Sequence, residues 1–185
     1  MGAGGKTSPG GPPWTIVSTA NEFDGSSWTA TPTMGTGRYG VGCSGLGTQT
    51  ATLYCGGYDG PTTSDKVELY NGSTWSEEPG MSNAKAYQMV AGTTTAALVG
   101  GGQPPTSTEQ TLEWNGSAWS SGGDLPTWRY FLGGCGTQVA ALACGGYTPS
   151  YSNETNTYNG TAWATSPATI AVSYTHLTLP TILRV

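Results

Sequence analysis

The chain has 185 residues, of which 30 are glycine and only 9% are charged, and its formal net charge is −5. Lys and Arg total six and form no basic run, which argues against a nucleic-acid-binding surface. No apolar run approaches the roughly 20 residues of a membrane-spanning helix. Abundant glycine with few charges favours many short strands joined by tight turns.

The N-terminal segment, residues 1–15, is rich in glycine and proline and is expected to be mostly loop. It offers no apolar core for a signal peptide. Ala3-Gly4-Gly5 is similar to the end of a repeat that is clearer later in the chain.

A six-residue motif then recurs four times: an aromatic residue, Asp or Asn, Gly, two small residues and Trp. The copies are Phe23–Trp28, Tyr70–Trp75, Trp114–Trp119 and Tyr158–Trp163, and their Trp residues are 47, 44 and 44 positions apart. Such a period is typical of a repeat architecture, in which each unit buries its apolar face against its neighbours. We expect Trp28, Trp75, Trp119 and Trp163 to fill the gaps between units.

Each motif reads as two short strands around an Asp-Gly or Asn-Gly turn. These dipeptides favour two-residue hairpins, in which both central residues adopt positive φ. The aromatic residues on either side of the turn would then lie opposite each other and help to fix the strand register.

Between the motifs, a basic residue (Arg38, Lys85 or Arg129) is followed within two positions by an aromatic residue (Tyr39, Tyr87 or Tyr130). A small-residue strand follows, and then an apolar strand that ends in paired glycines. The pairs are Gly56 and Gly57, Gly101 and Gly102, and Gly145 and Gly146. The apolar residues before them run continuously, which indicates strands covered on both faces.

Four strands per repeat indicate four-stranded antiparallel sheets arranged as the blades of a β-propeller. We therefore expect an all-β partial β-propeller with three complete blades at about 38–76, 85–120 and 129–164, preceded by an outer half-blade at 16–29. An open arc of this kind would expose an apolar blade face at each end, which favours self-association.

The paired glycines, the aromatic–Trp pairs and the basic residues together resemble the kelch repeat over about residues 16–167. This resemblance implies a propeller but no particular activity, because kelch propellers act both as interaction modules and as enzyme scaffolds. The charge-poor composition further resembles repeats of bacteriophage and environmental bacterial proteins. The implied location is a virion, the cell surface or the extracellular space.

The C-terminal segment departs from the repeat. From Val172 the sequence lacks the repeat's glycines, and its first ten residues resemble a translated sequencing adapter. We therefore interpret residues 16–171 as the propeller fragment and 172–185 as a non-native tail; the alternative is a divergent capping strand.

Catalytic and metal-binding groups are scarce. The single histidine, His176, lies in the tail, and no Cys-x-x-Cys occurs, so we expect no metal, no cofactor and no enzymatic activity. A galactose-oxidase-type site would need histidines that this chain lacks. The alternative is an enzyme scaffold, an oxidase or a glycan hydrolase, whose active residues lie in a missing part.

Binding is the favoured function, and the candidate loops follow the paired glycines. Tyr58, Tyr147 and Tyr151 stand there among small polar residues, a setting typical of recognition surfaces for a protein or glycan partner. The alternative is that these loops are merely solvated. The basic residues Arg38, Lys85 and Arg129 could line a binding face, but their periodic placement favours a role in holding each blade.

Overall fold

The computed structural model describes residues 1–7, 14–103 and 108–168. All the regular secondary structure in these ranges is β-strand. Blade 1 contains β1 (Gly2–Ala3), β4 (Ala20–Phe23) and β5 (Trp28–Thr31), and blade 2 contains β6 (Gly42–Cys43), β7 (Thr52–Cys55), β8 (Val67–Tyr70) and β9 (Trp75–Glu78). Blade 3 contains β10 (Met89–Gly92), β11 (Ala97–Gly100), β12 (Thr111–Trp114) and β13 (Trp119–Ser121). Blade 4 contains β14 (Gly133–Thr137), β15 (Ala140–Cys144), β16 (Thr155–Tyr158) and β17 (Trp163–Thr165), and β2 (Lys6–Thr7) pairs with β3 (Thr15–Ile16) as a hairpin. The expected tail, 172–185, lies outside the described residues.

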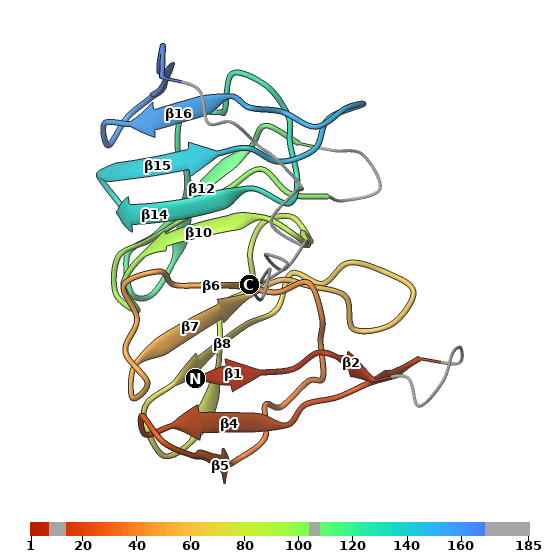
Figure 1. The fold of residues 1–185 in the computed structure, drawn as a ribbon. Coiled ribbons are helices and arrows are strands. Elements are labelled where there is room, and N and C mark those ends of the chain that lie inside the picture. The colour runs from red at the N-terminus through yellow and green to blue at the C-terminus, as the bar shows by residue number, and fades with distance from the viewer. Residues whose placement is uncertain (8–13, 104–107, 169–185) are drawn as a thin grey trace, which may run out of the picture.

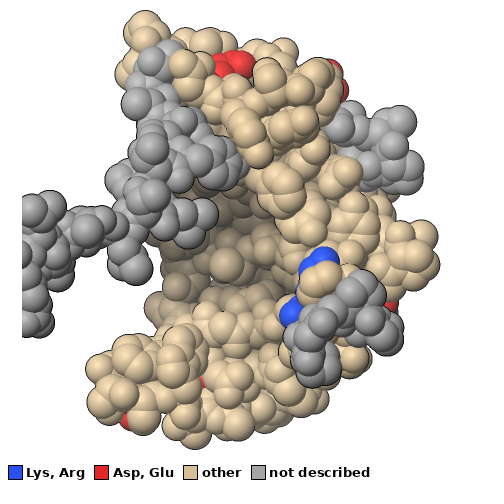
Figure 2. Space-filling model, turned by 45° about the vertical axis from the view of Figure 1, so that its right-hand side comes forward, with Lys and Arg blue, Asp and Glu red and all other residues tan. Residues whose placement is uncertain are grey.

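The blades follow one another around an arc (Figure 1). In each four-stranded blade the strands are antiparallel and lie in chain order. The first strand of blade 3, β10, contacts the first strands of both neighbouring blades, β6 and β14. Figure 2 shows a hollow between the two ends of the arc. The expected all-β partial propeller is therefore confirmed.

Blade 1 contains one strand more than the half-blade we expected, because β1 pairs with β4. Gly4 and Gly5 have φ of 71° and 121°, close to the 63° and 101° of Gly56 and Gly57. The N–H of Gly5 donates to the carbonyl of Arg38 at 2.8 Å, just as the N–H of Gly57 donates to the carbonyl of Lys85 at 2.7 Å. Part of the segment 1–15 thus belongs to the propeller.

The hairpin turns differ from the two-residue turns that we expected, and that expectation is wrong. Tyr70 pairs with Trp75, which leaves a four-residue loop in which only Gly72 has positive φ, at 92°. The Asn71 side-chain oxygen accepts from the N–H groups of Ser73 and Thr74, each at 2.9 Å. The Asn side chain therefore closes the turn, so Asn71 need not adopt positive φ.

Two buried clusters hold the blades together. Between blades 2 and 3 lie Leu53, Cys55, Val67, Met81, Val90, Ala97, Val99, Leu112 and Trp114; between blades 3 and 4 lie Met89, Ala91, Leu98, Leu125, Leu132, Ala141, Ala143, Tyr158 and Trp163. Strands β7 and β11 are buried along their whole length, which confirms that they are covered on both faces. In contrast, β15 alternates between exposed or half-buried and buried residues, since only one face of blade 4 packs on another described blade.

The aromatic pairs of blades 2, 3 and 4 fill the outer part of the gaps between blades, whereas Trp28 of blade 1 is exposed, contrary to our expectation. In every pair the first member is the more deeply buried. Tyr70 and Trp114 are 1% exposed. Trp75 and Trp119 are half-buried, and their indole N–H groups donate to carbonyls at the end of the preceding blade, those of Pro32 and Pro79, at 2.8 and 2.9 Å.

Two kinds of side-chain contact occur at the three interfaces between blades. They are Glu–Tyr contacts, Glu22 with Tyr70 and Glu113 with Tyr158, and an apolar contact at Leu69. The Tyr158 hydroxyl donates to Glu113 Oε1 at 2.6 Å, whereas Leu69 packs against the apolar cluster that contains Trp114. Burial raises the pKa of Tyr70, and the neighbouring Glu22 raises it further. A carboxylate thus faces Tyr at two interfaces, and apolar side chains meet at the third.

The repeated basic residues hold the blades. Arg38, Lys85 and Arg129 are fully buried. Their side chains donate to backbone carbonyls at 2.6–3.2 Å: Gly56 and Lys66 for Arg38, Gly145 and Glu154 for Arg129, and Gln110 for Lys85. These contacts support the structural reading of the basic positions, because buried cations have no access to an outside partner.

Candidate binding face

One end of the blades carries a continuous row of aromatic side chains. We define the aromatic row as Tyr39, Tyr58, Tyr87, Phe131, Tyr130, Tyr147 and Tyr151. Each ring contacts the next, with centroid separations of 4.3–5.7 Å. The row runs across blades 2, 3 and 4, so residues more than a hundred positions apart share one surface.

Two loops of each blade supply the row. The first follows the buried basic residue and carries Tyr39 in blade 2 and Tyr130 in blade 4. The second follows the paired glycines and carries Tyr58 and Tyr147. The two loops form antiparallel bridges, Tyr39 with Tyr58 and Tyr130 with Tyr147, with N–H to carbonyl distances of 2.7–3.2 Å. The backbone of the row is therefore fixed by hydrogen bonds.

Two aromatic residues have an unusual backbone. Tyr87 and Phe131 are the only described non-glycine residues with positive φ, at 56° and 57°. The corresponding residue of blade 2 is Gly40, with φ of 65°. The Tyr87 N–H donates to the Gly40 carbonyl and the Phe131 N–H donates to the Tyr87 carbonyl, each at 2.8 Å. Strain of this kind in bulky residues is characteristic of functional sites.

Exposure distinguishes the row from the core. Phe131 and Tyr151 are 58% and 61% exposed, and the other members are half-buried. Tyr39 and Tyr58 stack with an interplanar angle of 16°, whereas Tyr147 and Tyr151 meet edge to face at 77°. Between these two ends of the row the neighbouring rings are tilted by 50–54°.

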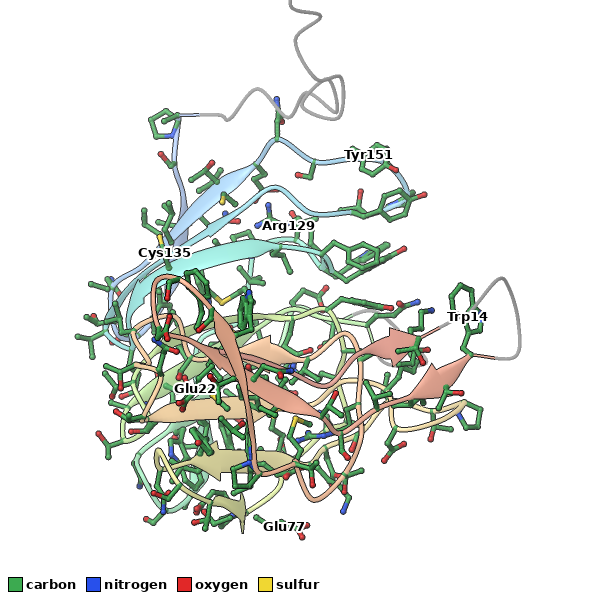
Figure 3. All side chains as sticks on the ribbon, turned by 60° about the horizontal axis from the view of Figure 1, so that its bottom comes forward. Trp14, Glu22, Glu77, Arg129, Cys135 and Tyr151 are labelled. Atoms are coloured by element: carbon green, nitrogen blue, oxygen red, sulfur yellow. The ribbon has the colours of Figure 1, made fainter. Side chains whose placement is uncertain are left out.

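The row continues beyond blade 2 toward the β2–β3 hairpin. The ammonium group of Lys6 lies 4.5 Å from the centroid of the Tyr39 ring and 4.6 Å from that of Trp14, within the range of cation–π attraction. A cavity of about 390 Å³ opens here, lined by Lys6, Trp14, Ile16, Tyr39 and Gly60. Figure 3 shows Trp14 and Tyr151 projecting on the same side of the molecule.

The phenols of Tyr58 and Tyr87 stay protonated at neutral pH. Burial raises the pKa of Tyr58, and the neighbouring Tyr39 and Tyr130 raise it further. Burial likewise raises the pKa of Tyr87. Neutral hydroxyls can donate and accept hydrogen bonds, so the face offers both apolar area and polar contacts.

The structure brings the sequence candidates Tyr58, Tyr147 and Tyr151 into this row. In the sequence, Tyr39, Tyr87 and Tyr130 are recognisable only as repeated positions. Phe131, Trp14 and Lys6 were not predicted as members of a binding face. Tyr39, Tyr87 and Tyr130 could have been predicted as part of one surface, since an aromatic residue recurs beside each buried basic residue. Nothing in the sequence marked the positive φ that projects Phe131.

Chemical groups of other kinds do not gather in the parts of the chain that the structure describes. These parts contain no cluster of three or more His, Cys, Asp or Glu residues that could hold a metal ion. Their four cysteines, Cys43, Cys55, Cys135 and Cys144, are all free thiols. No helix within 1–7, 14–103 or 108–168 is long and apolar enough to cross a membrane.

The fold defines a β-propeller-like protein whose described blades form an open arc. No family model matches the chain, and no curated protein matches it. Among solved structures it is similar to YjhT, with a TM-score of 0.67 and 14% sequence identity, over 82% of this chain. The match covers 52% of the YjhT chain, so this chain spans about half the length of that protein. At this identity the similarity concerns the fold alone.

Proposed function

We propose that this chain is a non-enzymatic binding module that recognises an extended ligand, a protein segment or a glycan, along the aromatic row. The observation that carries the proposal is the continuity of half-exposed rings across three blades, on loops fixed by bridges at Tyr39–Tyr58 and Tyr130–Tyr147. Aromatic side chains with few rotatable bonds offer large contact area at low entropic cost.

The backbone of the row supports the same function. Positive φ at a bulky residue costs about 1–2 kcal/mol, and Tyr87 and Phe131 both bear this cost while projecting aromatic rings into the row. Blade 2 adopts the same backbone with Gly40, so the fold itself does not require a large side chain there. A recognition role accounts for the aromatic residues.

The repeat pattern also indicates the class of protein to which this binding module belongs. The paired glycines, aromatic pairs and buried basic residues resemble kelch repeats, whose propellers include interaction modules. We propose a kelch-like module of a phage particle or microbial surface protein. The alternative, an enzyme scaffold of the oxidase or glycan-hydrolase type, requires active residues outside the described ranges and predicts turnover by a longer protein.

The experiment screens the chain on a glycan microarray and against a displayed peptide library, then measures affinities by calorimetry. The double variant Tyr58→Ser, Tyr147→Ser is expected to lose at least about tenfold in affinity, since it removes one ring near each end of the row. The control variant is Val139→Ser, whose side chain is 61% exposed but lies outside the row. Equal losses in both variants, or no binder in either screen, would contradict the proposal.

A further inference from the structure

The outer face of blade 1 exposes an aromatic pair that the other blades bury. Phe23 and Trp28 occupy the position of Tyr158 and Trp163 in blade 4, with similar ring separations of 5.2 and 5.0 Å. Trp28 is 62% exposed and Trp163 only 8%; Phe23 is 37% exposed and Tyr158 only 3%. The difference arises because Tyr158 and Trp163 pack on blade 3, whereas no described blade precedes blade 1.

The space beside this pair has the form of an unfilled interface between blades. A cavity of about 530 Å³ lies there, lined by Gly2, Ala3, Gly4, Thr19, Asn21 and Trp28. Blade 1 also has the order β1-β4-β5, whereas β6, β10 and β14 add an inner strand to the other blades. Within the described residues, β1 is thus an edge strand next to an exposed aromatic pair.

The opposite end of the arc carries the complementary surface. On blade 4, Cys135 is exposed, and Leu142 and Cys144 are half-buried. Their counterparts in blade 2, Leu53 and Cys55, are 0% exposed because blade 3 covers them. The free face of blade 4 therefore consists of the positions that, in blade 2, are covered by the next blade. None of these residues is charged.

We propose that two copies of this chain associate head to tail, with Phe23 and Trp28 of one copy packed on the Leu142 and Cys144 face of blade 4 of the other. The internal interfaces show how this packing works. A Trp163 ring carbon lies 3.5 Å from the position that a Cβ on Gly100 would take, and Gly100 is the counterpart of Cys144. The contact repeats the interface between consecutive blades.

Such a contact is heterologous, so it forms a closed ring only if the rotation between copies completes a turn. Two arcs of four blades give eight blades, which lies at the upper end of the usual range of four to eight. The second copy is therefore an occupant with the shape and the apolar character of the blade that packs at each internal interface.

The first test is the mass in solution by sedimentation equilibrium. The chain is expected to reach about twice its 19.0 kDa as concentration rises. Trp28→Arg and Cys135→Arg, placed at opposite ends of the arc, should each abolish the dimer because each puts a charge into an apolar contact. Trp14→Arg is the matched control, since Trp14 is 53% exposed but lies outside both faces. Circular dichroism and thermal melting check that the variants fold.

Mixing the two variants shows whether the copies associate head to tail or symmetrically. A mixture of Trp28→Arg and Cys135→Arg chains retains one unmodified pair of faces, so head-to-tail packing predicts that the dimer returns in the mixture. A symmetric contact of the Trp28 face with itself predicts instead that the Cys135→Arg chain still dimerises on its own, and that result, or no recovery in the mixture, would overturn the proposal. A wild-type chain that stays monomeric at all concentrations would overturn it as well.

Discussion

The Arg38 guanidinium donates to Glu68 Oε1 at 2.8 Å inside blade 2, and both side chains are buried. The backbone N–H groups of Gly35 and Thr36 donate to the same carboxylate at 2.7 and 3.3 Å. Glu68 thus neutralises a buried cation and orders the connection from blade 1. A buried ion pair of this kind costs desolvation energy, so its loss is most damaging when only one partner is removed.

Replacing Glu68 with Leu is expected to destabilise the chain by about 3–5 kcal/mol, because it leaves Arg38 charged and buried. Blade 3 has Lys85 and Leu112 at the same two positions, so Arg38→Lys should recover part of the loss when combined with Glu68→Leu. Urea unfolding of the two single variants and the double variant measures the coupling. Strictly additive losses would show that the two residues act independently.

The aromatic residues between blades should differ sharply in their contribution to stability. Trp114→Ala is expected to cost about 3–5 kcal/mol, since this side chain is 1% exposed and lies in the cluster between blades 2 and 3. Trp28→Ala should change the stability of the monomer by less than about 0.5 kcal/mol. Denaturant unfolding at low protein concentration tests both, and a comparable cost for Trp28 would mean that the monomer buries its ring.

The Tyr158–Glu113 hydrogen bond predicts a pH dependence of stability. Burial, followed by this hydrogen bond, raises the pKa of Tyr158 to about 12. Since the folded pKa lies above the ordinary tyrosine value of 10, the unfolded chain releases the proton first as the pH rises. Stability from Tyr158 is therefore complete below pH 10 and is lost between about 10 and 12.

Tyr158→Phe provides the comparison. The free energy of unfolding of the wild type should fall more steeply than that of the variant between pH 10 and 12, while the difference between the two stays constant from pH 7 to 9. Parallel curves across the whole range would contradict the assignment.

The buried ammonium group of Lys85 predicts that stability rises with pH, in a pH range that begins lower than that of Tyr158. Burial lowers the pKa of its ammonium group from 10.5 to about 8, although Asp124 acts against the shift. Between pH 8 and 10.5 the unfolded chain holds the proton that the folded chain has released, so the Lys85 contribution becomes more favourable as pH rises. The stability of the wild type relative to Lys85→Met should therefore increase from pH 8 to 10, as measured by urea unfolding at each pH. A decrease would contradict the pKa shift.

The blade architecture was predictable because its determinants repeat. Paired glycines, aromatic pairs and buried basic residues occur at nearly fixed spacing, and each copy reinforces the interpretation of the others. The strand β1 was harder to recognise, since only Gly4 and Gly5 mark it and no basic residue of its own precedes them. In the hairpins, Asn-Gly was read as a two-residue turn, but the Asn71 side chain stabilises a longer loop.

The aromatic row could not be predicted in full because contacts between loops create it. Tyr87 and Phe131 lie 44 positions apart in sequence, yet their ring centroids are 4.3 Å apart. That contact depends on positive φ at both residues, which the sequence gives no reason to expect for bulky side chains. The members on the loops after the paired glycines were predictable as exposed aromatics, but not as neighbours.

The different pairs between blades also affect how the chain folds. Near-identical repeats can exchange neighbours during folding, which is a characteristic failure of repeat proteins. Here an exchange that packed blade 3 on blade 1 would bring Trp114 against Glu22, and one that packed blade 4 on blade 2 would bring Tyr158 against the face of Leu69. Each would leave a carboxylate or a buried hydroxyl without its partner. Both misassemblies would be penalised, so the alternation of Glu–Tyr and apolar contacts disfavours an assembly that skips one blade.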